Sequence, residues 1–266
     1  MNDCIFLIVA KYYMSKPTKT KKKIQVEPTI INFDSNEESN EYKIHKVQIA
    51  QDKIDANINM INGNISNELF RQIVAKLKPN QWLHCAVDDE LDNGELNNVQ
   101  ETEEFVFKPD GLFFSKGEWL FQHLSVDQNY IYIADVDYSK IKVITDENDL
   151  FDFMQKYMNA RRIKNKNQTK IKLLQEEGYF GFCIIPDPKI LLNKLIKKNK
   201  INKKSYKSLR SYDVSTLVLW NPKEVITSLK CIMNSQEFVE FLENKKGKKE
   251  PQMNYTKLAD RLLQIL

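Results

Sequence analysis

Short apolar runs of strand type, unevenly spaced along the chain, constrain the fold of this sequence most strongly. Seven runs rich in β-branched and aromatic residues span 81–87, 112–115, 130–136, 140–144, 179–185, 214–220 and 225–232. Apolar residues at helical spacing separate only some of these runs, as at 146–158, and another such stretch at 66–77 precedes the first run. A doubly wound parallel sheet would require regular alternation of strands and helices. We therefore predict an α+β fold with a mixed or antiparallel sheet and short peripheral helices.

Four local patterns predict further elements. The stretch 42–49 (YKIHKVQI) predicts a strand, and 130–144 predicts a long hairpin of two strands. Thr145 is suited to cap the helix at 146–158 because its hydroxyl can accept from a free backbone N–H. The sequence Asn234-Ser235-Gln236-Glu237 resembles a capping box that opens a short helix.

Composition changes along the chain predict three parts. Residues 1–65 form a basic and polar N-terminal extension that we expect to be largely disordered, and Met14 is an alternative start to Met1. Residues 66–244 form the α+β core domain. Residues 245–266 form a linker and an amphipathic C-terminal helix. We expect that helix to dock on its own domain, with a protein partner as the alternative.

Composition also excludes several classes of protein. Hydrophobic residues make up 42% of the chain, which is enough for a core and excludes disorder throughout. The four cysteines lie far apart and the chain has only three histidines, so neither a metal site nor a disulfide framework is expected. No apolar stretch is long enough to span a bilayer. Reduced cysteines predict an intracellular protein, cytoplasmic or nuclear.

Charge is segregated along the chain. Residues 88–110 carry nine acidic side chains against one lysine, whereas residues 161–210 carry fifteen Lys or Arg against three acidic residues. The lysine-rich region is either a solvated face or a surface for a polyanion such as nucleic acid.

Two segments carry a family resemblance. The first is Lys108-Pro109-Asp110-Gly111-Leu112-Phe113-Phe114-Ser115, and the second runs from Tyr212 to Asn221 (YDVSTLVLWN). With the strand around His84, they resemble ADP-ribosyltransferases of the diphtheria-toxin and PARP kind. The same two segments look like uncharacterised proteins of large DNA viruses and protists. The resemblance implies a split β-sheet core and NAD as the cofactor.

The resemblance also implies roles for individual residues. His84 would donate to the adenosine ribose, Phe113 would face the nicotinamide, and Gly111 and Ser115 belong to the same cofactor-binding segment. Thr216 stands where that family keeps its catalytic glutamate, and Asp213 is the nearby acid that would substitute for it. Cys85 and Ala86 also depart from the Gly-Ser/Thr that usually follows the histidine.

Each of these residues has a structural alternative. His84 and Phe113 suit a half-buried core position, and Ser115 suits a helix cap. Without the glutamate, the sequence leaves open whether the domain is an active transferase or a degenerate one. A function of another class, a non-catalytic nucleic-acid-binding or virion and assembly protein, would use the same lysine-rich region 161–210.

Overall fold

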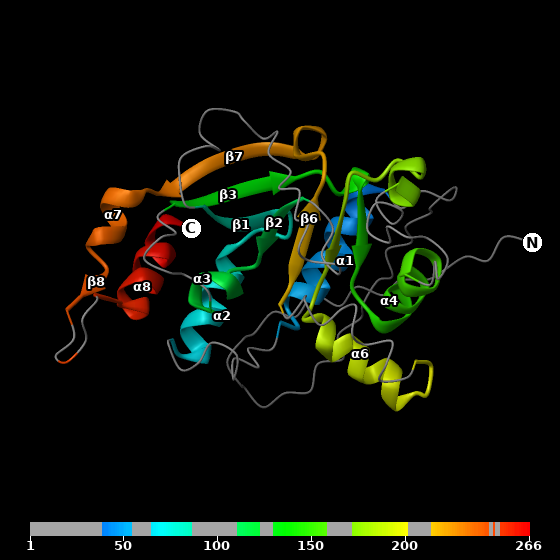
Figure 1. Ribbon diagram of the computed structural model, residues 1–266, viewed down its shortest axis with the longest axis horizontal. Helices are drawn as coiled ribbons and strands as arrows, with labels where there is room; N and C mark the ends of the chain where they lie inside the picture. Colours follow the sequence, from blue (N-terminus) through cyan, green and yellow to red (C-terminus); the bar gives the residue numbers. More distant parts are fainter. Residues whose placement is uncertain are drawn as a thin grey trace, which may run out of the picture. The chain divides into compact units, whose positions relative to one another are not determined.

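A seven-stranded sheet in the order β4-β5-β6-β2-β1-β3-β7 organises the part of the chain that the structure describes (Figure 1). This computed structural model describes residues 39–54, 65–86, 111–122, 130–158, 172–201, 214–244, 247 and 251–266. The strands of the sheet are β1 (Gln81–Ala86), β2 (Leu112–Ser115), β3 (Tyr130–Val136), β4 (Ile141–Ile144), β5 (Gly181–Ile184), β6 (Thr216–Leu219) and β7 (Ile226–Met233). Each of the seven runs is therefore a strand, and a further run of strand type at 104–107 (EFVF) lies outside the described residues.

Helices and short elements connect and cover these strands. The helices are α1 (Asn40–Gln51), α2 (Asn67–Lys76), α3 (Glu118–Gln122), α4 (Glu147–Phe153), α6 (Pro188–Lys197), α7 (Ser235–Val239) and α8 (Tyr255–Ile265). Short helical turns are η2 (Tyr138–Lys140), η3 (Met154–Met158) and η5 (Pro222–Glu224), and β8 (Leu242–Glu243) pairs with β9 (Gln252–Met253). The predicted capping box at Asn234 and Glu237 opens α7. Only β4 and β5 pair in parallel among the sheet strands, so the predicted α+β class with a mixed, mostly antiparallel sheet is confirmed.

The predicted hairpin of β3 and β4 is wrong. β3 lies between β1 and β7, whereas β4 lies at the opposite edge of the sheet beside β5. The connection η2 explains the separation, because Tyr138 points into the core rather than out of a tight turn. Its hydroxyl donates to the carbonyl of Pro79 at 2.7 Å and accepts from the Trp82 indole at 2.8 Å.

The predicted strand at 42–49 is also wrong, because this stretch lies in α1. Ser39 caps the helix by accepting from the backbone N–H of Tyr42. Lys43, Val47 and Ala50 follow helical spacing, and all three are buried. α1 belongs to the same compact unit as the rest of the described chain, which begins at Ser39. Polar and apolar residues alternate in this stretch as in a strand, but burial of one helical face determines its structure.

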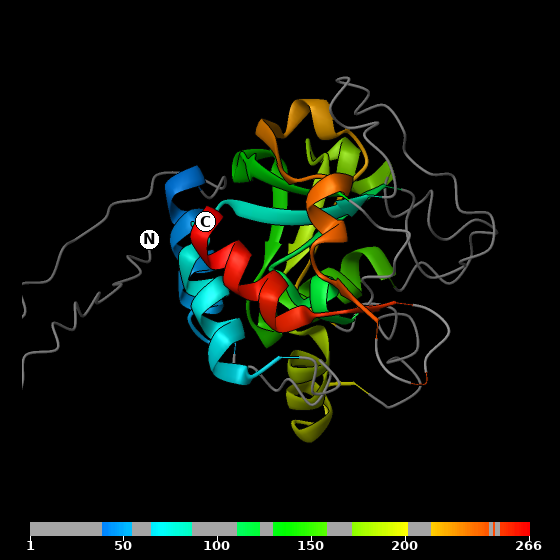
Figure 2. The same ribbon diagram turned by 90° about the vertical axis from the view of Figure 1, so that its left-hand side faces the viewer.

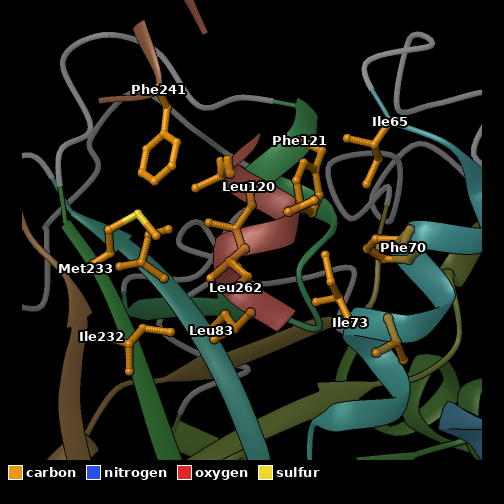
Figure 3. Close-up of a cluster of buried hydrophobic side chains, with 14 of the residues drawn as sticks. Ile65, Phe70, Ile73, Leu83, Leu120, Phe121, Ile232, Met233, Phe241 and Leu262 are labelled. Atoms are coloured by element: carbon orange, nitrogen blue, oxygen red, sulfur yellow. The ribbon is translucent and has the colours of Figure 1, made fainter. Parts of the chain in front are cut away.

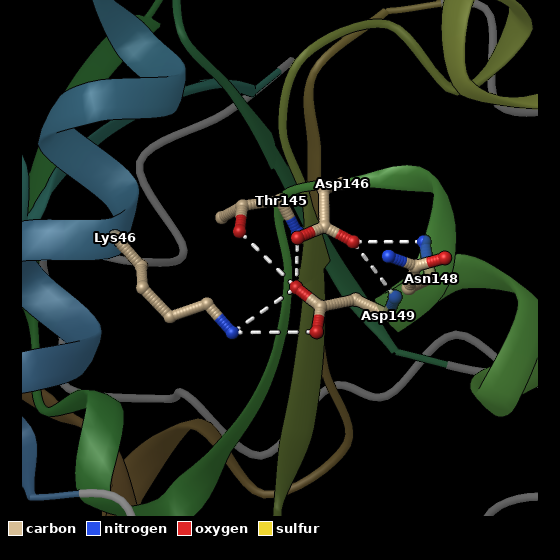
Figure 4. Close-up of polar contacts among 5 residues, drawn as sticks. All are labelled: Lys46, Thr145, Asp146, Asn148 and Asp149. Carbon is tan, nitrogen blue, oxygen red and sulfur yellow. Dashed lines mark hydrogen bonds and ion pairs between the residues drawn. The ribbon is translucent and has the colours of Figure 1, made fainter. Parts of the chain in front are cut away.

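A polar contact ties α1 to α4 (Figure 4). Lys46 Nζ lies 3.1 Å from Asp149 Oδ2, which also accepts from the backbone N–H and hydroxyl of Thr145. The cap of α4 is Asp146, whose carboxylate accepts from the N–H groups of Asn148 and Asp149. Thr145 is therefore not the cap that the sequence predicted. A carboxylate also suits the helix N-terminus better than a hydroxyl because it complements the helix dipole.

Three groups of buried apolar side chains form the core. The α2–α8 cluster includes Phe70, Ile73, Leu83 and Leu262, and it places α8 beside α2 (Figures 2 and 3). The α4–α6 cluster includes Leu150, Phe182, Ile184, Leu192 and Val218. The α1 cluster includes Val47, Trp82, Phe114, Cys183 and Leu217. Since residues alternate between faces along each strand, α1 covers one face of the sheet and the other two clusters lie on the opposite face.

Candidate functional site

The three segments that carry the family resemblance lie on adjacent strands. β1 pairs with β2, and β2 pairs with β6. Their register places Leu83, Ser115, Thr216 and, from β5, Ile184 in one row across the sheet. Leu83 belongs to the α2–α8 cluster and Ile184 to the α4–α6 cluster, so the polar pair Ser115 and Thr216 lies in a seam between two apolar clusters.

His84 lies where β1 and β2 part. Leu83 and Ser115 are the only registered pair between these strands, and the remainder of β1 pairs with β3 alone. The His84 Nδ1 atom lies 2.7 Å from the carbonyl oxygen of Phe113. Because a carbonyl only accepts, Nδ1 carries a proton. Burial lowers the pKa of His84, and the hydrogen bond to Phe113 raises it by less. The neutral ring therefore offers an acceptor at Nε2 instead of the donor we expected.

The structure does not place His84 and Phe113 on the same face of the sheet. The His84 ring lies 5.3 Å from that of Phe114, on the face that α1 covers. Phe113 is half-buried and points to the opposite face, where its ring centroid lies 6.2 Å from that of Trp119. The two residues nevertheless touch through the Phe113 carbonyl, so they flank the point where β1 and β2 separate.

Gly111 and Ser115 have structural tasks at the two ends of β2. A Cβ atom at Gly111 would lie 2.9 Å from the carbonyl oxygen of Leu219, so this position needs glycine for close packing against β6. The buried Ser115 hydroxyl accepts from the N–H groups of Gly117 and Trp119 at 3.2 and 3.4 Å. These two contacts at the start of α3 suit the alternative role of Ser115 as a helix cap.

Thr216 is fully buried at the start of β6, and its hydroxyl donates to the carbonyl of Val214 at 2.8 Å. The side chain at this position is a hydroxyl, and not the carboxylate that the family resemblance leads us to expect. Asp213, the acid we expected to substitute, lies outside the described residues.

Two buried charged residues next to Ser115 were missed by sequence reasoning. Lys116 is fully buried, and its Nζ donates to the carbonyls of Pro79 and Gln81 at 2.8 and 2.5 Å and lies 4.3 Å from the Trp82 ring centroid. Burial lowers the pKa of Lys116 to about 7, and electrostatic interactions with Cys183 and Glu118 raise it by less. Nothing in the sequence around Lys116 marks this lysine as buried, because charged side chains are rarely buried.

Glu118 is the second missed residue. It is 8% exposed, and its Oε1 accepts from the backbone N–H of Ser215 at 3.2 Å. Burial raises the pKa of Glu118 to about 7, and nearby N–H groups and the Ser215 side chain lower it by less. Glu118 therefore brings a carboxylate to the residue that precedes Thr216. The only signal in the sequence was its place three residues after Ser115, at the start of an apolar helix.

Residues 172–201 of the lysine-rich region 161–210 are described, whereas the remainder, with nine of its fifteen basic residues, lies outside the described residues. Lys194 on α6 and Lys198, the C-cap of that helix, approach the carboxylate of Glu147 at 3.9 and 2.6 Å. Nucleic-acid binding by this region stays a prediction. The C-terminal helix α8 buries Leu258 and Leu262 against its own domain, as expected.

The chain matches no protein-family model, and neither curated proteins nor solved structures give a match. Within the described ranges, no group of three His, Cys, Asp or Glu side chains could hold a metal ion. Among the described helices, none has the length and apolar composition needed to cross a membrane. A function can therefore be inferred only from the arrangement of side chains where β1, β2 and β6 meet.

Proposed function

We propose that this chain is an ADP-ribosyltransferase-like domain that binds NAD at the seam formed by β1, β2 and β6. The observation that carries the proposal is the adjacency of these three strands. The segments that resemble the family are about 30 and 100 residues apart in sequence, yet they share the row Leu83, Ser115, Thr216. A common binding site requires that adjacency, whereas most arrangements of seven strands would not produce it.

The side chains at the seam suit a dinucleotide. The half-buried rings of Phe113 and Trp119 offer an apolar face for the nicotinamide. The Nε2 atom of His84 can accept a hydrogen bond from a ribose hydroxyl at the place where β1 and β2 part. The ligand would therefore reach both faces of the sheet through the open end of the β1–β2 pair.

Calorimetric titration of the full chain with NAD tests the proposal. We expect saturable binding by the wild type and at least tenfold weaker binding by Phe113→Ala and His84→Gln, a loss of roughly 1.4 kcal/mol or more. Glutamine at 84 can still donate to the Phe113 carbonyl, so the fold is retained. His45→Ala on α1 is the matched control and should bind like the wild type. Absence of binding by the wild type at millimolar NAD would contradict the proposal.

A further inference from the structure

A cavity of about 630 Å³ lies between the end of α1 and one side of α2. Residues 51–54 line it from the end of α1. Arg71, Val74 and Ala75 line it from α2, where spacings of three and four residues place them on the same side of the helix. Small-molecule sites in proteins measure roughly 300–1,000 Å³. The cavity is therefore large enough for a small organic molecule rather than a single ion.

The walls of the cavity combine apolar surface with positive charge. Ile54, Val74 and Ala75 supply the apolar part, on which a flat ring can pack. The side chains of Lys53 and Arg71 line the same space and are exposed, so a ligand that enters from solvent can reach them. The residues proposed to bind NAD do not line this cavity, which is therefore a separate place in the fold.

The balance of charge at the cavity favours an anion. Lys53 and Arg71 contribute two positive charges, against one negative charge from Asp52. Asp52 Oδ1 accepts from the Gln48 side chain at 2.7 Å, so that oxygen is already engaged. A guanidinium group can bind two phosphate oxygens at once, which makes arginine a frequent partner of phosphate groups.

Gln51 forms a buried wall of the cavity. It is 4% exposed, and its Nε2 donates to the carbonyls of Val74 and Leu77 at 3.0 and 2.8 Å, at the end of α2. Its Oε1 has no hydrogen-bond partner in the described part of the chain. Lys43 and Lys116 each bind two backbone carbonyls elsewhere in this fold, and an ammonium group leaves no acceptor unpaired. Binding the end of α2 therefore does not explain the unpaired oxygen, whereas a ligand N–H in the cavity would pair with it.

We propose that the cavity between α1 and α2 binds a nucleoside monophosphate whose base carries an amino group. The base packs on Val74 and Ala75, and its amino group donates to Gln51 Oε1. The phosphate binds Arg71 and Lys53. This inference does not rest on the proposed function, because NAD binding at the seam uses other residues.

Calorimetric titration of the full chain with CMP and UMP tests the inference. UMP has a carbonyl oxygen where CMP has its amino group, and the two probes carry the same ribose phosphate. We expect saturable binding of CMP with a dissociation constant below about 1 mM. UMP should bind at least tenfold more weakly, because its carbonyl oxygen would face the acceptor Gln51 Oε1.

Two substitutions at the cavity and one control locate the binding. Arg71→Gln removes a positive charge and should weaken CMP binding at least tenfold. Ala75→Trp fills the cavity from an exposed helix position and should abolish CMP binding. Lys76→Gln removes a charge at an exposed position of the same helix that does not line the cavity, and it should bind CMP within about twofold of the wild type. Melting temperatures of all three variants verify that the fold is retained.

Three results would overturn the inference. They are no saturable binding of CMP at millimolar concentration, equal affinity for CMP and UMP, and wild-type affinity for CMP in both Arg71→Gln and Ala75→Trp. Affinity for NAD should be the same in Arg71→Gln as in the wild type, so a failure of this inference leaves the proposed function intact.

Discussion

At the scale of single residues, the polar groups of the seam were only partly foreseeable. His84, Phe113 and Ser115 stood out because they belong to strand segments with a recognisable order. Lys116 and Glu118 did not, because a charged side chain in a short turn is normally solvated. Their burial depends on the carbonyls of Pro79 and Gln81 and on the N–H of Ser215, groups supplied by distant segments.

Gly111 gives a prediction about packing at this scale. Gly111→Ala should destabilise the fold by about 1–3 kcal/mol, because the added Cβ would lie 2.9 Å from the Leu219 carbonyl oxygen and 3.0 Å from Val218 Cγ1. Gly178→Ala is the control, since its Cβ would meet nothing within 4 Å and only its positive φ opposes alanine. Urea denaturation of both variants checks the prediction. Gly178→Ala should lose stability only through its positive φ, and a Gly111→Ala variant as stable as the wild type would contradict the packing argument.

The buried Glu118 predicts a loss of stability with rising pH. Its pKa is raised from 4.5 to about 7 on folding, so the folded state binds more protons than the unfolded state in that range. The free energy of unfolding should therefore fall as pH rises from about 4.5 to about 7. Glu118→Gln should lack this fall. Melting temperatures of both proteins across the range are the measurement, and parallel curves would contradict it.

Lys116 predicts the opposite trend at higher pH. Its pKa is lowered from 10.5 to about 7 on folding, so the unfolded state binds more protons between these values. The contribution of Lys116 to the free energy of unfolding should therefore rise as pH rises from about 7 to about 10.5. Melting temperatures of the wild type and of Lys116→Met, measured up to pH 10, check this prediction. A rise in melting temperature that persists in Lys116→Met would contradict it.

At the scale of elements, the sequence predicted where strands occur better than how they pair. All seven runs became strands because each has enough apolar residues to be buried wherever it lies in the sheet. The β3–β4 hairpin failed because Tyr138 is anchored in the core by Trp82 and Pro79, a constraint that the local sequence does not contain.

The helix α1 allows a direct test of an element that the sequence misassigned. Val47→Ala should lower the free energy of unfolding by roughly 2 kcal/mol, because Val47 is fully buried in the α1 cluster. Ile49→Ala on the same helix should have little effect, since Ile49 is 39% exposed. Chemical denaturation of the two variants distinguishes a packed helix from a peripheral one. Equal, small effects would mean that α1 does not stabilise the domain.

At the scale of the whole molecule, the described chain from Ser39 onward forms one compact unit in which both α1 and α8 take part. The α+β class was predictable because it follows from the order and spacing of apolar runs. The seam was not, because it arises where β1 and β6, 130 residues apart in sequence, both flank β2. Site residues could therefore be proposed from the sequence, but their placement on opposite faces, as for His84 and Phe113, could not.

The three tryptophans offer the most direct test of the central claim, that NAD binds at the seam. Each indole N–H gives a separate NMR signal, assignable by single Trp→Phe variants. Titration of the full chain with NAD should shift the Trp119 signal saturably, because its ring lies beside Phe113. The Trp82 signal should shift less than the Trp119 signal, since the Trp82 N–H is held by Tyr138. Absence of any shift of the Trp119 signal at millimolar NAD, or equal shifts of all three signals, would contradict the account.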